Sequence, residues 1–166
     1  MEELRKTKEN LSEELLSSRS SVIEMQGKLS AVKDNFIGPF TFDAVKQLLT
    51  KDRPDHSVLN KLKKELEDKE GSESEIELVK KIEELNYTPL EMLMHIKPQL
   101  ATTGFGTGNV NEEGHRYFNH FYLSKWIELS LVEVQKPVNT KRKKNVLSAN
   151  GRKFVSMVEI EKLSEK

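Results

Sequence analysis

The residues best suited to chemistry are the basic side chains near the C-terminus. Residues 114–158 hold nine basic and two acidic side chains, whereas residues 71–113 hold three basic and eight acidic ones. The basic run 141–144 lies between two short segments of alternating apolar residues, 131–134 and 145–148. That arrangement predicts a β-hairpin with a basic turn. Positive charge gathered on a turn suits phosphate binding, and a solvated basic surface without a ligand is the alternative.

Other reactive groupings are sparse in this sequence of 166 residues. There is no cysteine, and no metal-binding motif includes the histidines at positions 56, 95, 115 and 120. The glycine-rich stretch 104–109 lacks the lysine of a phosphate-binding loop, so we expect a connecting loop there. A loop ordered by a partner through Phe105 is the alternative. We therefore expect no enzyme activity, no cofactor and no metal.

Helical spacing flanks the predicted hairpin on both sides. Residues 117–129 have the periodicity of a helix, and Ser148 is a suitable cap for a second helix. The expected apolar side of that second helix consists of Phe154, Val155, Val158 and Ile160. The basic turn is thus predicted to lie between two helices.

Two groups of residues frame the turn: Leu131-Val132-Glu133 before it and Leu147-Ser148-x-x-Gly151-Arg152-x-Phe154 after it. With the flanking helices, they resemble the wing and following helix of bacterial winged-helix regulators of the MarR and PadR kind. The resemblance covers the C-terminal part only. It implies a winged-helix-like unit there and, with that fold, contact with DNA.

The helix expected over 117–129 is rich in aromatic residues. Its i, i+3 and i+4 positions are filled by Phe118, Phe121, Tyr122, Lys125, Trp126 and Leu129. This spacing predicts a face buried in the core. Stacking on nucleic-acid bases, aided by the interleaved basic residues, is the alternative. Few polar side chains suited to base edges are present, which favours DNA binding without sequence-specific readout.

The N-terminal residues 4–36 carry a seven-residue repeat typical of a coiled coil. Its apolar positions are Leu4, Leu11, Leu15, Val22, Met25, Leu29, Val32 and Phe36. Lys8 and Ser18 occupy the two remaining positions of the repeat. The narrow stripe predicts a long helix that forms a homodimer, parallel or antiparallel. Packing of this helix against its own chain is the alternative.

Between the coiled coil and the hairpin, turn and cap residues predict four short helices. They are expected to begin near Thr41, Asp55, Ser72 and Thr88, the last two through Ser/Thr-x-x-Glu capping patterns. The expected domains are a coiled-coil helix at 1–37, a helical domain at 38–97, a flexible linker at 98–113 and a winged-helix-like domain at 114–166. The predicted fold class is mainly α with one β-hairpin.

These observations predict a dimeric DNA-binding protein, a transcriptional regulator or a DNA-associated accessory factor. The expected contacts to double-stranded DNA come from Arg116, Lys125, Lys136, Lys141, Arg142, Lys143, Lys144, Arg152 and Lys153. No apolar run is long enough to span a bilayer and no signal-peptide core is present, so we expect a cytoplasmic protein. The alternatives are a protein–protein adaptor that uses the coil and the acidic segment 71–113, and a non-catalytic subunit of a DNA-processing complex.

Overall fold

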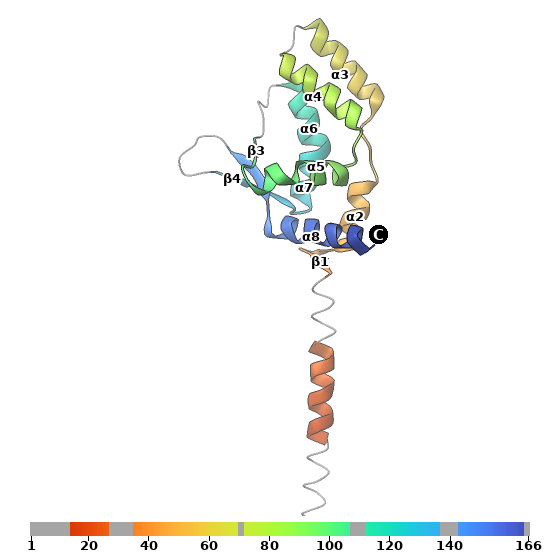
Figure 1. The fold of residues 1–166 in the computed structure, drawn as a ribbon, viewed down its shortest axis with the longest axis vertical. Coiled ribbons are helices and arrows are strands. Elements are labelled where there is room, and N and C mark those ends of the chain that lie inside the picture. Colours follow the sequence, from red (N-terminus) through yellow and green to blue (C-terminus); the bar gives the residue numbers. More distant parts are fainter. Residues whose placement is uncertain (1–13, 27–34, 70–71, 107–111, 137–142, 165–166) are drawn as a thin grey trace, which may run out of the picture. The chain divides into compact units, whose positions relative to one another are not determined.

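The structure is a computed structural model that describes residues 14–26, 35–69, 72–106, 112–136 and 143–164 (Figure 1). The chain divides between Phe36 and Ile37 into two compact units. Residues 14–26 of the first unit are helical. The elements that follow are β1 (Phe36–Ile37), β2 (Phe40–Thr41), α2 (Phe42–Thr50), α3 (His56–Asp68), α4 (Glu73–Leu85), α5 (Pro89–Ala101), β3 (Phe105–Gly106), α6 (Glu113–Phe118), η1 (Asn119–Leu123), α7 (Ser124–Glu128), β4 (Val132–Gln135), β5 (Lys144–Leu147) and α8 (Ala149–Ser164).

The described residues form a mainly helical fold, as predicted, but they contain two small sheets where one β-hairpin was expected. β1 pairs with β2, and the second sheet has the order β3-β5-β4. β4 and β5 form the predicted antiparallel hairpin, with Val132 opposite Leu147 and Gln135 opposite Lys144. β3 lies antiparallel on the other edge of β5. The hairpin is therefore tied to a third strand that sequence reasoning placed in a loop.

In the first unit, the described helix exposes the apolar residues of the predicted repeat. Leu15, Val22 and Met25 all lie in it and are all exposed, as are Leu16 and Ile23. Leu4, Leu11, Leu29 and Val32 lie outside the described residues. The last repeat position does not continue the helix, because Phe36 belongs to strand β1. Gly38 follows with φ of 60°, a left-handed value that reverses the chain into β2.

The second unit has one core to which the predicted helical and winged-helix-like segments both contribute. Val45 and Leu93 are buried in the same cluster as Trp126 and Phe154. The ring centroids of Phe42 in α2 and Phe154 in α8 lie 5.4 Å apart. Residues 38–97 and 114–166 are thus not separated into two cores in the described structure. Apolar side chains of α2 and α5 pack against α7 and α8. The composition of the sequence does not predict this contact.

Of the eleven described residues in the segment expected to be a linker, 98–113, seven belong to helices or a strand. Residues 98–101 continue α5 past Pro98, and residues 105–106 form β3. Phe105 packs against Phe118, with ring centroids 5.1 Å apart. Residues 107–111 lie outside the described part of the chain. The glycines that suggested a loop include Gly104, which has φ of 74° and turns the chain from α5 into β3.

Side-chain caps begin several helices at the predicted positions. Asp55 accepts hydrogen bonds from the backbone of the first turn of α3. Thr88 and Glu91 form the predicted capping box at the start of α5. Ser72 precedes α4 as expected but makes no capping hydrogen bond. The carboxylate of Glu75, which would complete that second box, instead accepts a hydrogen bond from the backbone N–H of Gly114 at 3.3 Å.

The helix of the aromatic residues runs from α6 through the π-helical turn η1 into α7. Phe118, Tyr122 and Trp126 are buried, which confirms the predicted core face. The Tyr122 hydroxyl donates to the carbonyl oxygen of Tyr87 at 2.9 Å, and burial raises the pKa of Tyr122. These rings occupy the interior and leave no stacking surface of their own.

Helix α8 buries Phe154, Val155 and Val158, as predicted. Ile160 was expected on the same side, but 66% of it is exposed. Two residues further along a helix turn a side chain by about 200°, so Ile160 points away from the face that holds Val158. The ion pairs of α8 to Lys46 and Lys97 hold this helix to α2 and α5.

Candidate nucleic-acid interface

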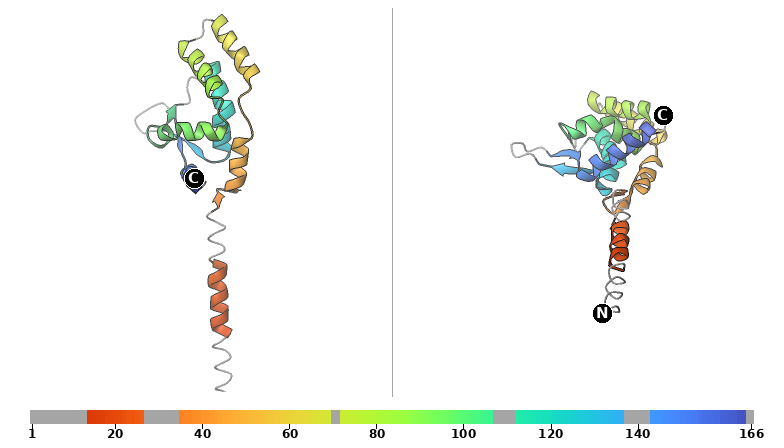
Figure 2. Two further views of the ribbon diagram at one scale, coloured as in Figure 1. Left: turned by 45° about the vertical axis from the view of Figure 1, so that its right-hand side comes forward. Right: turned by 60° about the horizontal axis from the view of Figure 1, so that its bottom comes forward.

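The hairpin β4–β5 carries the candidate interface, and its strands extend away from the helices in Figure 1 and in the right-hand view of Figure 2. On β5, Asn145 and Leu147 are buried, whereas Lys144 and Val146 are half-buried. On β4, only Val132 is buried, and the other residues are exposed. The hairpin therefore packs on the body at its base and leaves its distal residues in solvent.

A buried amide fixes β5 to the neighbouring strand. Asn145 is fully buried, and its side-chain nitrogen donates to the carbonyl oxygen of Phe105 at 3.1 Å. Its side-chain oxygen is also buried and has no hydrogen-bond partner among the described residues. Burial of a polar side chain is tolerated where hydrogen bonds compensate it. Here the amide locks the position of β5 relative to β3.

The base of the hairpin is closed by Ser148. Its hydroxyl donates to the carbonyl oxygen of Ser130 at 2.5 Å and accepts from the N–H of Gly151 at 2.9 Å. The backbone N–H of Ser148 donates to the carbonyl oxygen of Leu131 at 3.0 Å. Ser148 thus links both strands to the first turn of α8, which confirms its predicted role as a helix cap.

The basic residues of the hairpin divide into described and undescribed positions. Lys136 and Lys143 are exposed, and Lys144 is half-buried. None of these three lysines forms an ion pair with another described residue. Lys141 and Arg142 lie outside the described residues. The acidic residue on the described strands, Glu133, accepts a hydrogen bond from the side chain of Gln135 at 2.9 Å.

Arg152 and Lys153 follow the hairpin in the first turn of α8. A guanidinium nitrogen of Arg152 donates to the carbonyl oxygen of Leu147 at 2.8 Å, although the residue is exposed. Arg152 is thereby held at the base of the hairpin. Lys153 is half-buried and interacts within the protein. Arg152 thus lies at the base of the same hairpin that carries the lysines at its other end.

Lys125 lies apart from this group. Its ammonium nitrogen is 2.8 Å from a carboxylate oxygen of Asp52 and 4.8 Å from the centre of the Phe121 ring. The hydrogen bond from Lys125 and the attraction of its charge hold the pKa of Asp52 below its usual value. Because the ammonium group of Lys125 already pairs with Asp52, it is less available to bind a phosphate.

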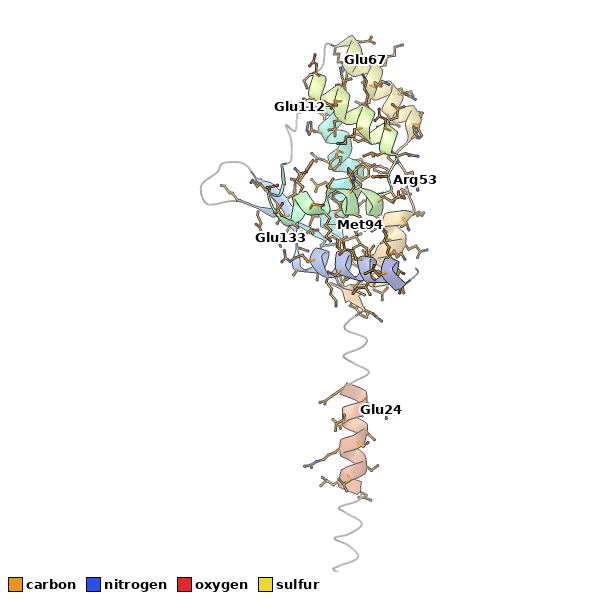
Figure 3. The ribbon with its side chains drawn as sticks, in the orientation of Figure 1. Glu24, Arg53, Glu67, Met94, Glu112 and Glu133 are labelled. Carbon is orange, nitrogen blue, oxygen red and sulfur yellow. The ribbon has the colours of Figure 1, made fainter. Side chains whose placement is uncertain are left out.

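Arg116 also lies outside the group on the hairpin. It is exposed on α6 and lines an open hollow of about 460 Å³ together with residues of α3, including Lys61 and Glu65. Glu112, directly before α6, lies near the ends of α4 and α6, whereas Glu133 marks the hairpin (Figure 3). The predicted contacts of Arg116 and Lys125 therefore do not join the hairpin in one surface.

One cluster of possible metal-ligating side chains was not predicted from the sequence. Glu75, Glu112 and His115 each offer a ligand atom, and these atoms lie within 4.8 Å of one another. Glu112 and His115 are one helical turn apart, a spacing that the sequence shows. Glu75 comes from another helix, and only the packing of α4 against α6 brings it to the pair.

The chain was compared with known protein families, curated proteins and solved structures. No protein-family model, no curated protein and no solved structure matches it significantly. None of the helices that the structure describes combines the length and the apolar character needed to cross a lipid bilayer.

Proposed function

We propose that this protein is a homodimer that binds double-stranded DNA through its basic hairpin, as a transcriptional regulator or accessory factor. The observation that carries the proposal is the set of lysines Lys136, Lys143 and Lys144. They lie on a projecting hairpin and have no ion-pair partner among the described residues. Arg152 adds a fourth cation at the base of the hairpin.

The order helix, hairpin, helix supports the proposed winged-helix-like character of this part. The helix before the hairpin buries its aromatic face, and so it supports the hairpin more than it reads DNA bases. Contacts from lysines on a hairpin reach phosphates, which position a protein without specifying a sequence. We therefore propose binding that depends on charge and tolerates any sequence.

The decisive experiment removes charge at the open end of the hairpin. Replace Lys136, Lys141, Arg142 and Lys143 with Gln and keep Lys144, whose stem packs near Gly104. Affinity for a mixed-sequence duplex at about 0.1 M salt should fall at least about tenfold, because lost phosphate contacts release fewer counterions. The slope of log affinity against log salt should decrease by about 0.9 for each contact removed. Fluorescence anisotropy at several salt concentrations measures both.

A matched control carries the same change in charge elsewhere. Lys61, Lys64, Lys80 and Lys81 are exposed on α3 and α4, and none of them forms an ion pair with a described residue. Changing these four to Gln should leave the salt slope unchanged. If both variants lose the same affinity for DNA, the loss results from the change in net charge. The hairpin would then not be the DNA-binding surface.

The proposed dimer rests on the exposed apolar face of residues 14–26. Changing Leu15 and Val22 to Asp would place charges on this stripe, and we expect the mass in solution to fall from two chains to one. Light scattering coupled to gel filtration measures it. Ser17 and Ser20 lie on the opposite face of this helix, and S17D/S20D should remain dimeric. A wild-type chain that is monomeric at tens of micromolar would exclude the dimer.

The alternative is a protein–protein adaptor, which the same exposed face and the acidic segment 71–113 favour. In that case the hairpin is structural and its lysines are only solvated. A binding measurement on the wild-type chain distinguishes the two functions. If it binds no duplex even at low salt while it remains folded, the adaptor becomes the better proposal.

A further inference from the structure

Glu75, Glu112 and His115 meet where two helices begin. Glu75 lies in the first turn of α4, Glu112 precedes α6, and His115 lies in the first turn of α6. One ligand atom from each side chain falls within 4.8 Å of the others. Two carboxylates and an imidazole are donors of the kind that bind divalent transition metals in proteins.

Glu75 is the least exposed acidic residue of the group, and it lacks a basic partner. Only 6% of it is exposed, and no lysine or arginine among the described residues pairs with it. Among the described residues, its carboxylate accepts one hydrogen bond, from the N–H of Gly114 at 3.3 Å. By contrast, the neighbouring carboxylate of Glu113 has Lys69 at 3.3 Å. A buried carboxylate without a cation is costly, so the site around Glu75 favours a positive ligand.

His115 has a ring nitrogen that makes no hydrogen bond with another described residue. Nδ1 lies 2.7 Å from a carboxylate oxygen of Glu112, yet this atom is buried and has no hydrogen-bond partner among the described residues. The distance between these two atoms suits an ion pair, but their relative orientation does not suit a hydrogen bond. A ring nitrogen and a carboxylate oxygen that lie this close without a hydrogen bond are arranged like two neighbouring ligand atoms of one metal ion.

The charges at the site do not balance without a cation. The two carboxylates of Glu75 and Glu112 carry two negative charges, and neither pairs with a lysine or arginine among the described residues. A divalent cation carries the charge that offsets two carboxylates.

We propose that Glu75, Glu112 and His115 bind a divalent transition metal, with Zn²⁺ as the representative ion. In tetrahedral geometry, zinc–nitrogen and zinc–oxygen bonds of about 2.1 Å place two ligand atoms about 3.4 Å apart. The ligand atoms, which lie within 4.8 Å of one another, therefore need to close by up to about 1.4 Å. Three protein ligands leave a further position for solvent. The metal would join the start of α4 to the start of α6. This inference is independent of DNA binding.

The test is a titration of the metal-free full-length chain with Zn²⁺ by isothermal calorimetry. We expect one Zn²⁺ per chain and a melting temperature that rises with Zn²⁺ and returns with a chelator. H115Q and E75Q should each weaken binding at least about tenfold, since each removes a ligand. In E75Q the amide oxygen still accepts from Gly114. The matched controls are H120Q, exposed on the same continuous helix, and E77Q, exposed on α4; both should bind as the wild type does.

Three results would overturn the proposal. The first is the absence of Zn²⁺ binding to the wild-type chain, and the second is binding that H115Q and E75Q leave unchanged. The third is a melting temperature that does not rise with Zn²⁺. If the variants fail to fold, Co²⁺ is added to the wild-type chain in place of Zn²⁺. A Co²⁺ ion held in a tetrahedral site by these three side chains would absorb visible light, so the absence of that absorption excludes the site.

Discussion

Gly151→Ala should destabilise the fold strongly, by about 3 kcal/mol or more, at the upper end of what overpacking a core residue does. A Cβ atom at this position would lie 1.9 Å from the carbonyl oxygen of Leu131 and 2.9 Å from its carbonyl carbon. Both atoms are backbone, so no rotation of a side chain can relieve the overlap. The same carbonyl oxygen accepts the hydrogen bond of Ser148 that closes the hairpin base.

Gly114→Ala provides the matched comparison for this substitution. Gly114 is also buried in a first helical turn, but its Cβ would meet its nearest neighbours, Glu75 and Val79, at 3.3 Å. Alanine is favoured over glycine in a helix by up to about 1 kcal/mol, which offsets that tight contact. Urea denaturation followed by circular dichroism should therefore separate the two variants clearly. Similar midpoints for both would show that α8 does not approach β4 as closely as described.

The effect of G151A bears on the proposed function as well as on stability. Leu131 immediately precedes β4, and Gly151 lies in the first turn of α8, so their contact sets how the hairpin leaves the body. The group of residues that resembles winged-helix regulators includes Gly151. The physical reason, an approach of two backbones that admits no side chain, becomes visible only in three dimensions.

Two similar capping patterns show how far local sequence predicts structure. Thr88 and Glu91 form the expected capping box, in which the N–H of Thr88 donates to the Glu91 carboxylate at 2.8 Å. Ser72 and Glu75 have the same spacing but form none, because Glu75 turns to the N–H of Gly114 on another helix. Caps, turns and the hairpin depend on nearby residues and were predictable. The competing partner, 39 positions away, was not.

The candidate interface follows the same division. The lysines of the hairpin were predictable, because the alternating strands and the basic turn are adjacent in sequence. Lys125 was assigned to DNA on the basis of its charge, but Asp52, which engages it, is remote in sequence. Strand β3 was missed because two residues with a glycine carry too little periodicity to indicate a strand. Charge in the sequence shows where cations occur but not which of them are already paired.

Trp126→Ala is the second substitution for which we expect a large effect, a loss of about 3–5 kcal/mol in the free energy of unfolding. Trp126 is fully buried, with its ring centroid 6.0 Å from that of Tyr122 and 6.1 Å from that of Phe118. Its indole nitrogen donates to the carbonyl oxygen of Pro89 at 3.0 Å, which ties α7 to the first turn of α5. Truncation would leave a cavity and remove this bond together.

Two further variants separate these contributions. W126F keeps an aromatic ring but loses the hydrogen bond to Pro89, so its loss should be smaller, about 1–2 kcal/mol. Ile127→Ala removes a neighbouring side chain that is 41% exposed and should change stability by less than about 1 kcal/mol. Because Trp126 is the single tryptophan of the chain, circular dichroism and not fluorescence has to follow unfolding. If W126A and I127A unfold at the same urea concentration, α7 does not pack on α5, and the support that we assign to the hairpin is absent.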